Sequence, residues 1–342
     1  MTRIGILLIL LMLSVSAQLQ TISPVSIKSD ENGKGKQKKA PKKIYIADFR
    51  VNYQIMHIAQ DFEAGDKNAN DGYASGDIKV ILAIALTGLS NEDLQGNTDF
   101  LYKQFTQKLK DKGYEIVGAD AASGIKEFKG WERKTGGNLN KSQYKGFITS
   151  TPTGFEYYVK GTTSSGREKN TFTDNSAKIS HQLDNVTVAK VNLFLPMAEN
   201  GESWGSSAFL QDALAKVVLE TNLSLDDDIE FNTKGGGFAK TGVSFINSEA
   251  MGLPTSMNVY SLKKPIEISG VIEKKKYKIQ GMNQGSMAPF NAGPFYVLEV
   301  NNVVKEKTIP VPVDPTLYNS GVRMACEAFI NNATDQFFEN AF

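Results

Sequence analysis

Side chains able to carry catalysis are scarce in this sequence of 342 residues. Histidine occurs only at His57 and His181, and the single cysteine is Cys326. A Ser-His-Asp or Cys-His nucleophile would need one of the two histidines, and neither stands in a G-x-S-x-G or H-E-x-x-H motif. Two histidines and one cysteine are also a poor ligand set for zinc. The sequence therefore favours a protein that is not an enzyme.

The best candidate for a metal site is an acidic loop after the first long strand. Asp66, Asn68 and Asn70 have the spacing of the first three oxygen ligands in a calcium loop, and Asp77 falls at position 12. Position 6 of such a loop needs glycine for its sharp turn, but Asp71 stands there. The alternative is a surface turn rich in Asp and Asn. Calcium is the one candidate cofactor, and no other is expected.

Other features that could carry chemistry each have a simpler structural interpretation. The acidic run at residues 226–228 follows a strand and could belong to a carboxylate pair or to a solvated turn. The glycines at 235–237 lack the Lys and Ser/Thr of a phosphate-binding loop. Trp131 and Trp204 could stack on a sugar or a partner, although packing within the fold is the simpler role. Cys326 is expected to be a small buried residue.

Composition excludes some classes of function. The formal net charge is +1, so no overall field favours nucleic acid. The hydrophobic share of 41% is enough for a sizeable core. One cysteine rules out an internal disulfide, which argues against a small disulfide-stabilised secreted fold.

The N-terminus predicts export. Arg3 precedes an apolar run at residues 4–13, and small residues follow as far as Ala17. This is the pattern of a signal peptide cleaved after Ala17, which would leave Gln18 first. The alternative is a retained membrane anchor, but the run is shorter than the ~20 residues that span a bilayer. No cysteine stands at the cleavage site to carry a lipid, and no later stretch has the length and apolarity of a membrane helix.

Export predicts a periplasmic or outer-membrane-associated protein. Residues 18–42 are predicted to be a basic flexible linker, because they end in a charged, lysine-rich segment without a core residue. These lysines could touch an anionic surface, although a solvated tether is the simpler interpretation.

Residues 43–55 (KIYIADFRVNYQI) predict the strand around which the fold is organised. One face carries Tyr45, Ala47, Phe49, Val51, Tyr53 and Ile55. The other face begins with Ile44 and Ile46 and becomes polar at Asp48, Arg50, Asn52 and Gln54. The alternation predicts that one face of this strand is buried along its whole length and that the other face is buried only at the first residues of the strand.

The following residues predict partner strands and covering helices. Residues 78–86 suit a buried strand, with a helix as the alternative. A helix should begin at Ser90 and end at Gly113, and a strand follows at once. Residues 147–150 and 155–160 are predicted to form a hairpin. A last helix is expected after the cap residue Asp314, with an apolar stripe along it.

The fold class is therefore α+β, with long, mostly antiparallel strands and a few covering helices, including an amphipathic C-terminal helix. Four parts are predicted: a signal peptide at 1–17, the linker at 18–42, an α+β domain or half at 43–180, and a strand-rich α+β domain or half at 181–342 that ends in the helix.

The segments KKIYIADFRVNY and TDFLYKQFTQKLKDKGYEIVGAD, within residues 43–120, resemble the strand, helix and strand at the start of the curli-export lipoprotein family and of TolB N-terminal domains. The resemblance implies that the helix and the following strand pack on one sheet. The lipid-anchored cysteine of that family is missing here, and no amphipathic pore-forming hairpin is recognisable. No functional residue is therefore carried over.

Two functions remain open from the sequence. The first is an exported cell-envelope protein that binds or scaffolds a protein partner, such as a component of outer-membrane assembly or export. The second is a secreted hydrolase that uses carboxylates or bound calcium. A pocket lined by carboxylates with shifted pKa values would favour the hydrolase, and an exposed apolar patch would favour the binding protein.

Overall fold

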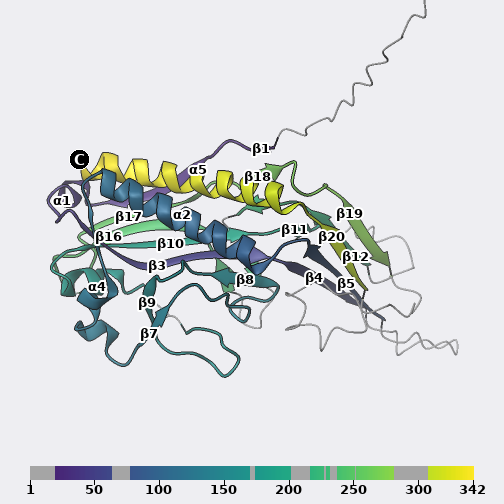
Figure 1. The fold of residues 1–342 in the computed structure, drawn as a ribbon, viewed down its shortest axis with the longest axis horizontal. Coiled ribbons are helices and arrows are strands. Elements are labelled where there is room, and N and C mark those ends of the chain that lie inside the picture. The colour runs from purple at the N-terminus through teal and green to yellow at the C-terminus, as the bar shows by residue number, and fades with distance from the viewer. Residues whose placement is uncertain are drawn as a thin grey trace, which may run out of the picture.

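The computed structural model describes residues 20–63, 78–169, 174–201, 216–226, 229–231, 237–250, 252–280 and 307–342. A central sheet lies between a layer of two long helices and a layer of short helices and strands, and an arm of strands projects from one end (Figure 1).

The central sheet has seven strands. In spatial order they are β2 (Ile27–Asn32), β17 (Ser256–Leu262), β16 (Gly242–Asn247), β10 (Thr187–Leu195), β3 (Lys43–Gln54) and β6 (Glu115–Val117), with β8 (Phe147–Ser150) also paired to β3. Only the β3–β10 and β3–β6 pairs are parallel. The other pairs of this sheet are antiparallel, which confirms the predicted α+β class.

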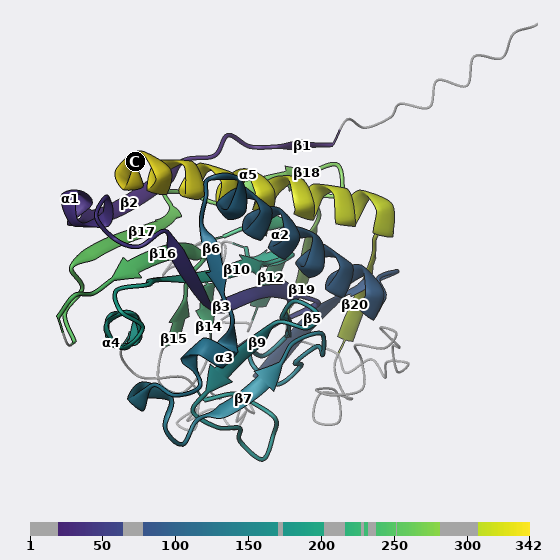
Figure 2. The ribbon, with the colours of Figure 1, turned by 60° about the vertical axis from the view of Figure 1, so that its left-hand side comes forward.

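Two helices, α2 (Asn91–Asp111) and α5 (Pro315–Ala341), cover one face of this sheet (Figure 2). The hydroxyl of Ser90 accepts the backbone N–H of Asp93, whose carboxylate accepts the N–H of Ser90, so α2 begins with a capping box. The carboxylate of Asp314 caps α5. The predicted stripe of α5 is buried and consists of Tyr318, Val322, Ala325, Phe329, Ala333 and Phe337.

A β-bulge in β3 corrects the predicted faces of this strand. Ile46 lies opposite Ala189 and Asp48 opposite Lys190, so Ala47 is an extra residue. The Tyr45 ring therefore contacts Phe128 in the layer of short elements, whereas the Phe49 ring contacts Phe105 of α2. Tyr45 and Phe49, predicted to share a face, lie on opposite faces.

The other face of the sheet is covered by residues between 119 and 182. This layer contains α3 (Ala119–Ala122), η1 (Lys126–Phe128), β7 (Glu132–Thr135), β9 (Glu156–Val159) and α4 (Ser176–Gln182). The predicted hairpin of β8 with β9 is wrong, because β8 pairs with β3 and β9 pairs with β7.

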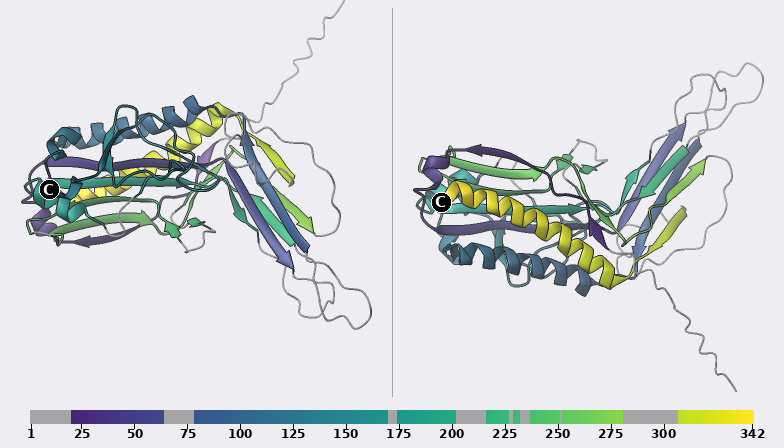
Figure 3. Two further views of the ribbon diagram at one scale, coloured as in Figure 1. Left: turned by 90° about the horizontal axis from the view of Figure 1, so that it is seen from below. Right: turned by 90° about the horizontal axis from the view of Figure 1, so that it is seen from above.

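Six of the described strands form the arm. One sheet contains β20 (Lys307–Pro312), β5 (Ile78–Thr87) and β4 (Met56–Glu63), and the other contains β11 (Ala198–Asn200), β12 (Lys216–Thr221) and β19 (Lys276–Gln280). Figure 3 shows both sheets leaving the body at an angle. Apolar side chains of both sheets belong to the main core, among them Leu82, Ile84, Val217 and Leu219.

The predicted flexible linker at residues 18–42 needs correction. Residues 27–32, expected in a flexible linker, form the edge strand β2 beside β17, and α1 (Lys34–Gln37) follows. The charged side chains of β2 are tolerated because it is an edge strand, with solvent beside it. The strands β3 and β10 are neighbours, so the boundary predicted at residue 180 does not separate two sheets.

Short strand pairs, each of two or three paired residues, complete the described elements. β1 (Thr21–Ile22) and β13 (Ser224–Leu225) flank β18 (Ile266–Ser269), and β14 (Ile229–Phe231) pairs with β15 (Gly237–Ala239). None of the helices in the described residues is both long enough and apolar enough to cross a membrane.

Candidate functional site

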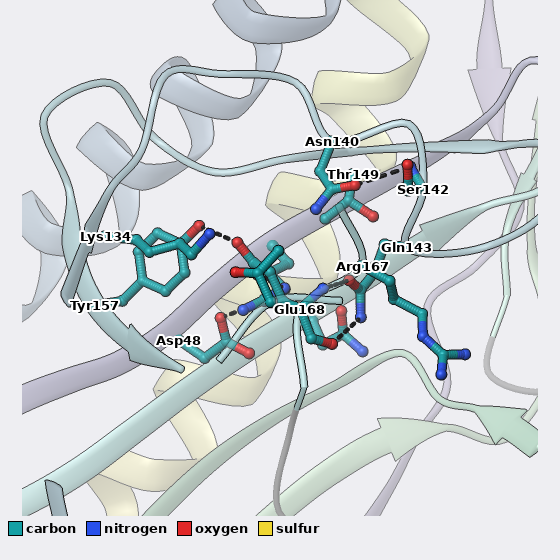
Figure 4. Close-up of polar contacts among 12 residues, drawn as sticks. Asp48, Lys134, Asn140, Ser142, Gln143, Thr149, Tyr157, Arg167 and Glu168 are labelled. Carbon is teal, nitrogen blue, oxygen red and sulfur yellow. Dashed lines mark hydrogen bonds and ion pairs between the residues drawn. The ribbon is translucent and has the colours of Figure 1, made fainter. Parts of the chain in front are cut away.

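The main polar cluster lies on the face of β3 that points away from α2 and α5 (Figure 4). Arg50 is buried there, although it carries a charge. Its Nε lies 2.7 Å from Oδ1 of Asp48, and its Nη1 lies 2.7 Å from Oε2 of Glu168. Burial lowers the pKa of the guanidinium, but the two carboxylates outweigh this effect and raise its pKa above the ordinary value.

Glu168 is held from several sides. The hydroxyl of Tyr157 donates to Oε1 across 2.8 Å, and the backbone N–H of Glu168 donates to Oε1 of Gln143 across 3.0 Å. The guanidinium of Arg50 also lies 5.3 Å from the centre of the Tyr157 ring. Burial and the nearby Glu168 raise the pKa of the Tyr157 phenol. Both oxygens of this carboxylate are therefore occupied, as in a structural ion pair.

Amide side chains continue the cluster along the strand. Thr149 donates its hydroxyl to Oδ1 of Asn52 across 2.7 Å. The Nδ2 of Asn52 donates to Oδ1 of Asn192 and to the carbonyl of Leu193, each across 2.9 Å. These bonds connect β3, β8 and β10, so they tie together three strands of the central sheet.

His57 lies where the body meets the arm, since only Ile55 separates β3 from β4. Its two ring nitrogens contact Gln54 and Asn200 at 2.9 and 3.0 Å. Burial lowers the pKa of the imidazole, and the hydrogen bond to Asn200 opposes this effect in part. His57 is therefore part of a joint between two strand pairs rather than a free base.

A group of carboxylates lies near the base of the arm. Glu199 stands opposite Glu220 on the neighbouring strand, and burial together with Glu220 and Asp226 raises the pKa of Glu199. Lysines neutralise part of this group, with Lys276 3.1 Å from Glu220 and Lys274 2.8 Å from Glu267.

A groove opens between the ends of α2 and α5. It is lined by Asp111, Lys112, Asp335, Phe338, Glu339 and Phe342. Two of its carboxylates already have partners, because Lys108 pairs with Asp335 and Gln107 donates to Asp111.

The other residues singled out in the sequence are accounted for as follows. Cys326 is fully buried in the core, and burial raises the pKa of its thiol. Nδ1 of His181 lies 3.1 Å from the carbonyl oxygen of Glu249. Trp131 packs edge-on against Phe128, as expected for structural packing.

The candidate calcium ligands Asp66, Asn68, Asn70 and Asp77 lie outside the described residues, as does Trp204. In the part of the chain that the structure describes, no group of three or more His, Cys, Asp or Glu side chains is placed to hold a metal ion.

A scan against protein-family models finds no matching family, and searches of curated proteins and of solved structures find no similar protein.

Proposed function

We propose that this protein is exported to the cell envelope and works there as a non-enzymatic binding or scaffold component, with the arm as its partner-binding part. The observation that carries the proposal is the arm itself, which places strands β4, β5, β12, β19 and β20 beyond the helix-covered body (Figure 3). Burial of the core under α2 and α5 does not require strands that extend beyond the helix-covered body.

The attachment of the arm supports this role. Val313 donates its backbone N–H to the carbonyl of Thr87, beside Gly88, whose φ is +102°. A Cβ at Gly88 would lie 2.5 Å from the carbonyl oxygen of Val313, so the two connections to α2 and α5 are in close contact. Gln54 ties β3 to the connection before β11, through the N–H of Met197. These contacts would hold the arm in a defined direction, as a presenting surface requires.

The polar cluster of the body favours binding over hydrolysis. Asp48 and Glu168 both bind Arg50, and the hydroxyl of Tyr157 donates a hydrogen bond to Glu168. Groups engaged in this way stabilise the fold, whereas a hydrolytic pair would need a carboxylate directed at open space. The signal-peptide pattern that ends at Ala17 supports export.

The test is site-specific photocrosslinking in the source cell. A photoreactive residue at Lys278, exposed on the arm, should give a discrete crosslinked product in the envelope fraction. The same residue at Lys103, exposed on α2, serves as the matched control and should not. N-terminal sequencing of the product should begin at Gln18. Equal crosslinking from both positions, or recovery only from the cytosol with Met1 retained, would contradict the proposal.

A further inference from the structure

The end of the body opposite the arm is built around α1. Gly33, at φ +73°, packs against Thr255 in the turn before β17, so closely that a Cβ there would lie 2.1 Å from the carbonyl oxygen of Thr255. The buried amide of Gln37 accepts a hydrogen bond from Ser256 across 2.8 Å. On the other side, Nζ of Lys42 donates to the carbonyl of Ala341 at the end of α5. Figure 1 shows α1 and the end of α5 together, away from β4 and β5.

Two of the four lysines at positions 34, 36, 38 and 39 are paired with carboxylates. Lys34 lies 2.9 Å from Glu31, and Lys36 lies 3.3 Å from Glu249. Lys38 and Lys39 are exposed, and neither pairs with a carboxylate of the described residues. Two positive charges therefore stand free on a short segment that is fixed to the body.

A large apolar side chain is exposed on the turn that contacts α1 through Gly33 and Lys36. Leu253 has 71% of its surface exposed, the highest value among the large hydrophobic side chains that the structure describes. Its turn is braced, because the hydroxyl of Ser248 donates to the carbonyl of Leu253 across 2.6 Å and Thr255 accepts the N–H of Glu249 across 2.7 Å. The backbone thus holds Leu253 outward. A single exposed leucine is ordinary on a surface, but this one lies on a turn that the ion pair of Glu249 with Lys36 joins to the lysine-bearing segment.

We propose that this end face, defined by Lys34, Lys36, Lys38, Lys39 and Leu253, docks on an anionic phospholipid surface. Lysines near a bilayer attract anionic headgroups, and a protruding leucine can enter the acyl boundary. The charge of the lysines also fits nucleic acid, but a phosphate backbone gives Leu253 nothing to contact. In this orientation the arm points away from the bilayer (Figures 1 and 3). The inference goes beyond the proposed function and does not depend on the partner of the arm.

Vesicle flotation of the full exported chain tests this docking. The protein should float with vesicles of phosphatidylglycerol and phosphatidylcholine in equal parts, and stay behind with phosphatidylcholine alone. Added salt should weaken the binding because it screens the lysines. The double variant Lys38→Gln/Lys39→Gln should weaken it about thirtyfold, taking roughly fivefold per lysine. Leu253→Ser should weaken it several-fold at unchanged melting temperature.

Lys263 and Lys264 provide the matched control. They are also adjacent and exposed, but they follow the far end of β17, away from α1. The variant Lys263→Gln/Lys264→Gln loses the same charge and should float like the wild type. Equal weakening by both double variants, binding to phosphatidylcholine alone, or no flotation of the wild type would overturn the proposal. Binding of an oligonucleotide with the same dependence on Lys38 and Lys39, together with flotation that is insensitive to Leu253→Ser, would assign the face to nucleic acid instead.

Discussion

The side-chain amide of Gln54 donates a hydrogen bond to Nδ1 of His57 across 2.9 Å. The amide cannot turn around, because its Oε1 already accepts the backbone N–H groups of Met197 at 2.9 Å and Ala198 at 3.3 Å. Nδ1 must therefore be unprotonated, and the proton of the neutral ring lies on Nε2, which donates to Oδ1 of Asn200 across 3.0 Å. A second proton, on Nδ1, would point at the N–H donor of Gln54 at the joint between body and arm.

This geometry predicts a loss of stability in acid. The folded-state pKa of His57 is lowered, so the neutral ring stabilises the fold fully above the unfolded pKa of about 6.5, and this stabilisation is lost as the pH falls through the folded pKa. The variant His57→Gln should show a smaller fall in the free energy of unfolding between about pH 7.5 and about pH 5. Urea titrations at each pH measure it. His181→Gln is the control, and its free energy of unfolding should vary with pH as in the wild type. If the free energy of unfolding of His57→Gln falls with pH as steeply as that of the wild type, this account is wrong.

Removing one partner of the buried ion pair should be costly. Glu168→Gln leaves Asp48 as the one carboxylate partner of the buried Arg50 guanidinium and weakens the charge-assisted hydrogen bonds to Glu168, a loss of about 1.5–3 kcal/mol. The exposed pair of Glu267 with Lys274 is the comparison, since Glu267→Gln should cost within about 1 kcal/mol. Urea titrations measure both losses, with the same dependence of the unfolding free energy on urea concentration used for each variant. Similar losses for the two variants would show that the buried cluster does not anchor the short layer.

The last helix should be docked by its predicted stripe. Phe329 is fully buried in the core, so Phe329→Ala should lower the free energy of unfolding by about 3–5 kcal/mol. Met324 lies on the same helix with 38% of its surface exposed, and Met324→Ala should cost less than about 1 kcal/mol. Denaturant titration separates the two variants. A loss below about 1 kcal/mol for Phe329→Ala would mean that α5 is not held by this face.

Local chemistry made some of the fold predictable. Ser90 and Asp93 form the capping box that begins α2, and Asp314 caps α5 as its sequence indicates. The alternation in β3 could not reveal that Ala47 is an extra residue, because a bulge is defined only by the partner strand. The strand β2 could not be predicted for a related reason. Its charged residues are typical of a linker, and it forms a strand only because it pairs with β17.

The polar cluster was less accessible to sequence reasoning. Asp48, Arg50 and Asn52 do alternate along one strand, which is a signal for a polar face. Nothing near them identifies Glu168 as the partner, because it stands 118 positions from Arg50 along the chain. Contacts between distant residues depend on how the layers pack, and local propensity does not encode that arrangement.

Calcium should not change the stability of this protein. If Asp66, Asn68, Asn70 and Asp77 bound the ion, their oxygens would have to come within about 2.4 Å of it. Binding would then add about 2.7 kcal/mol at a hundredfold excess of calcium over its dissociation constant, and the melting temperature would rise. Asp71 stands where the loop needs glycine, which disfavours the sharp turn. We therefore expect the same melting curve with calcium and with chelator, and the same curve for Asp66→Ala. A rise of several degrees that Asp66→Ala removes would instead establish the loop as a calcium site.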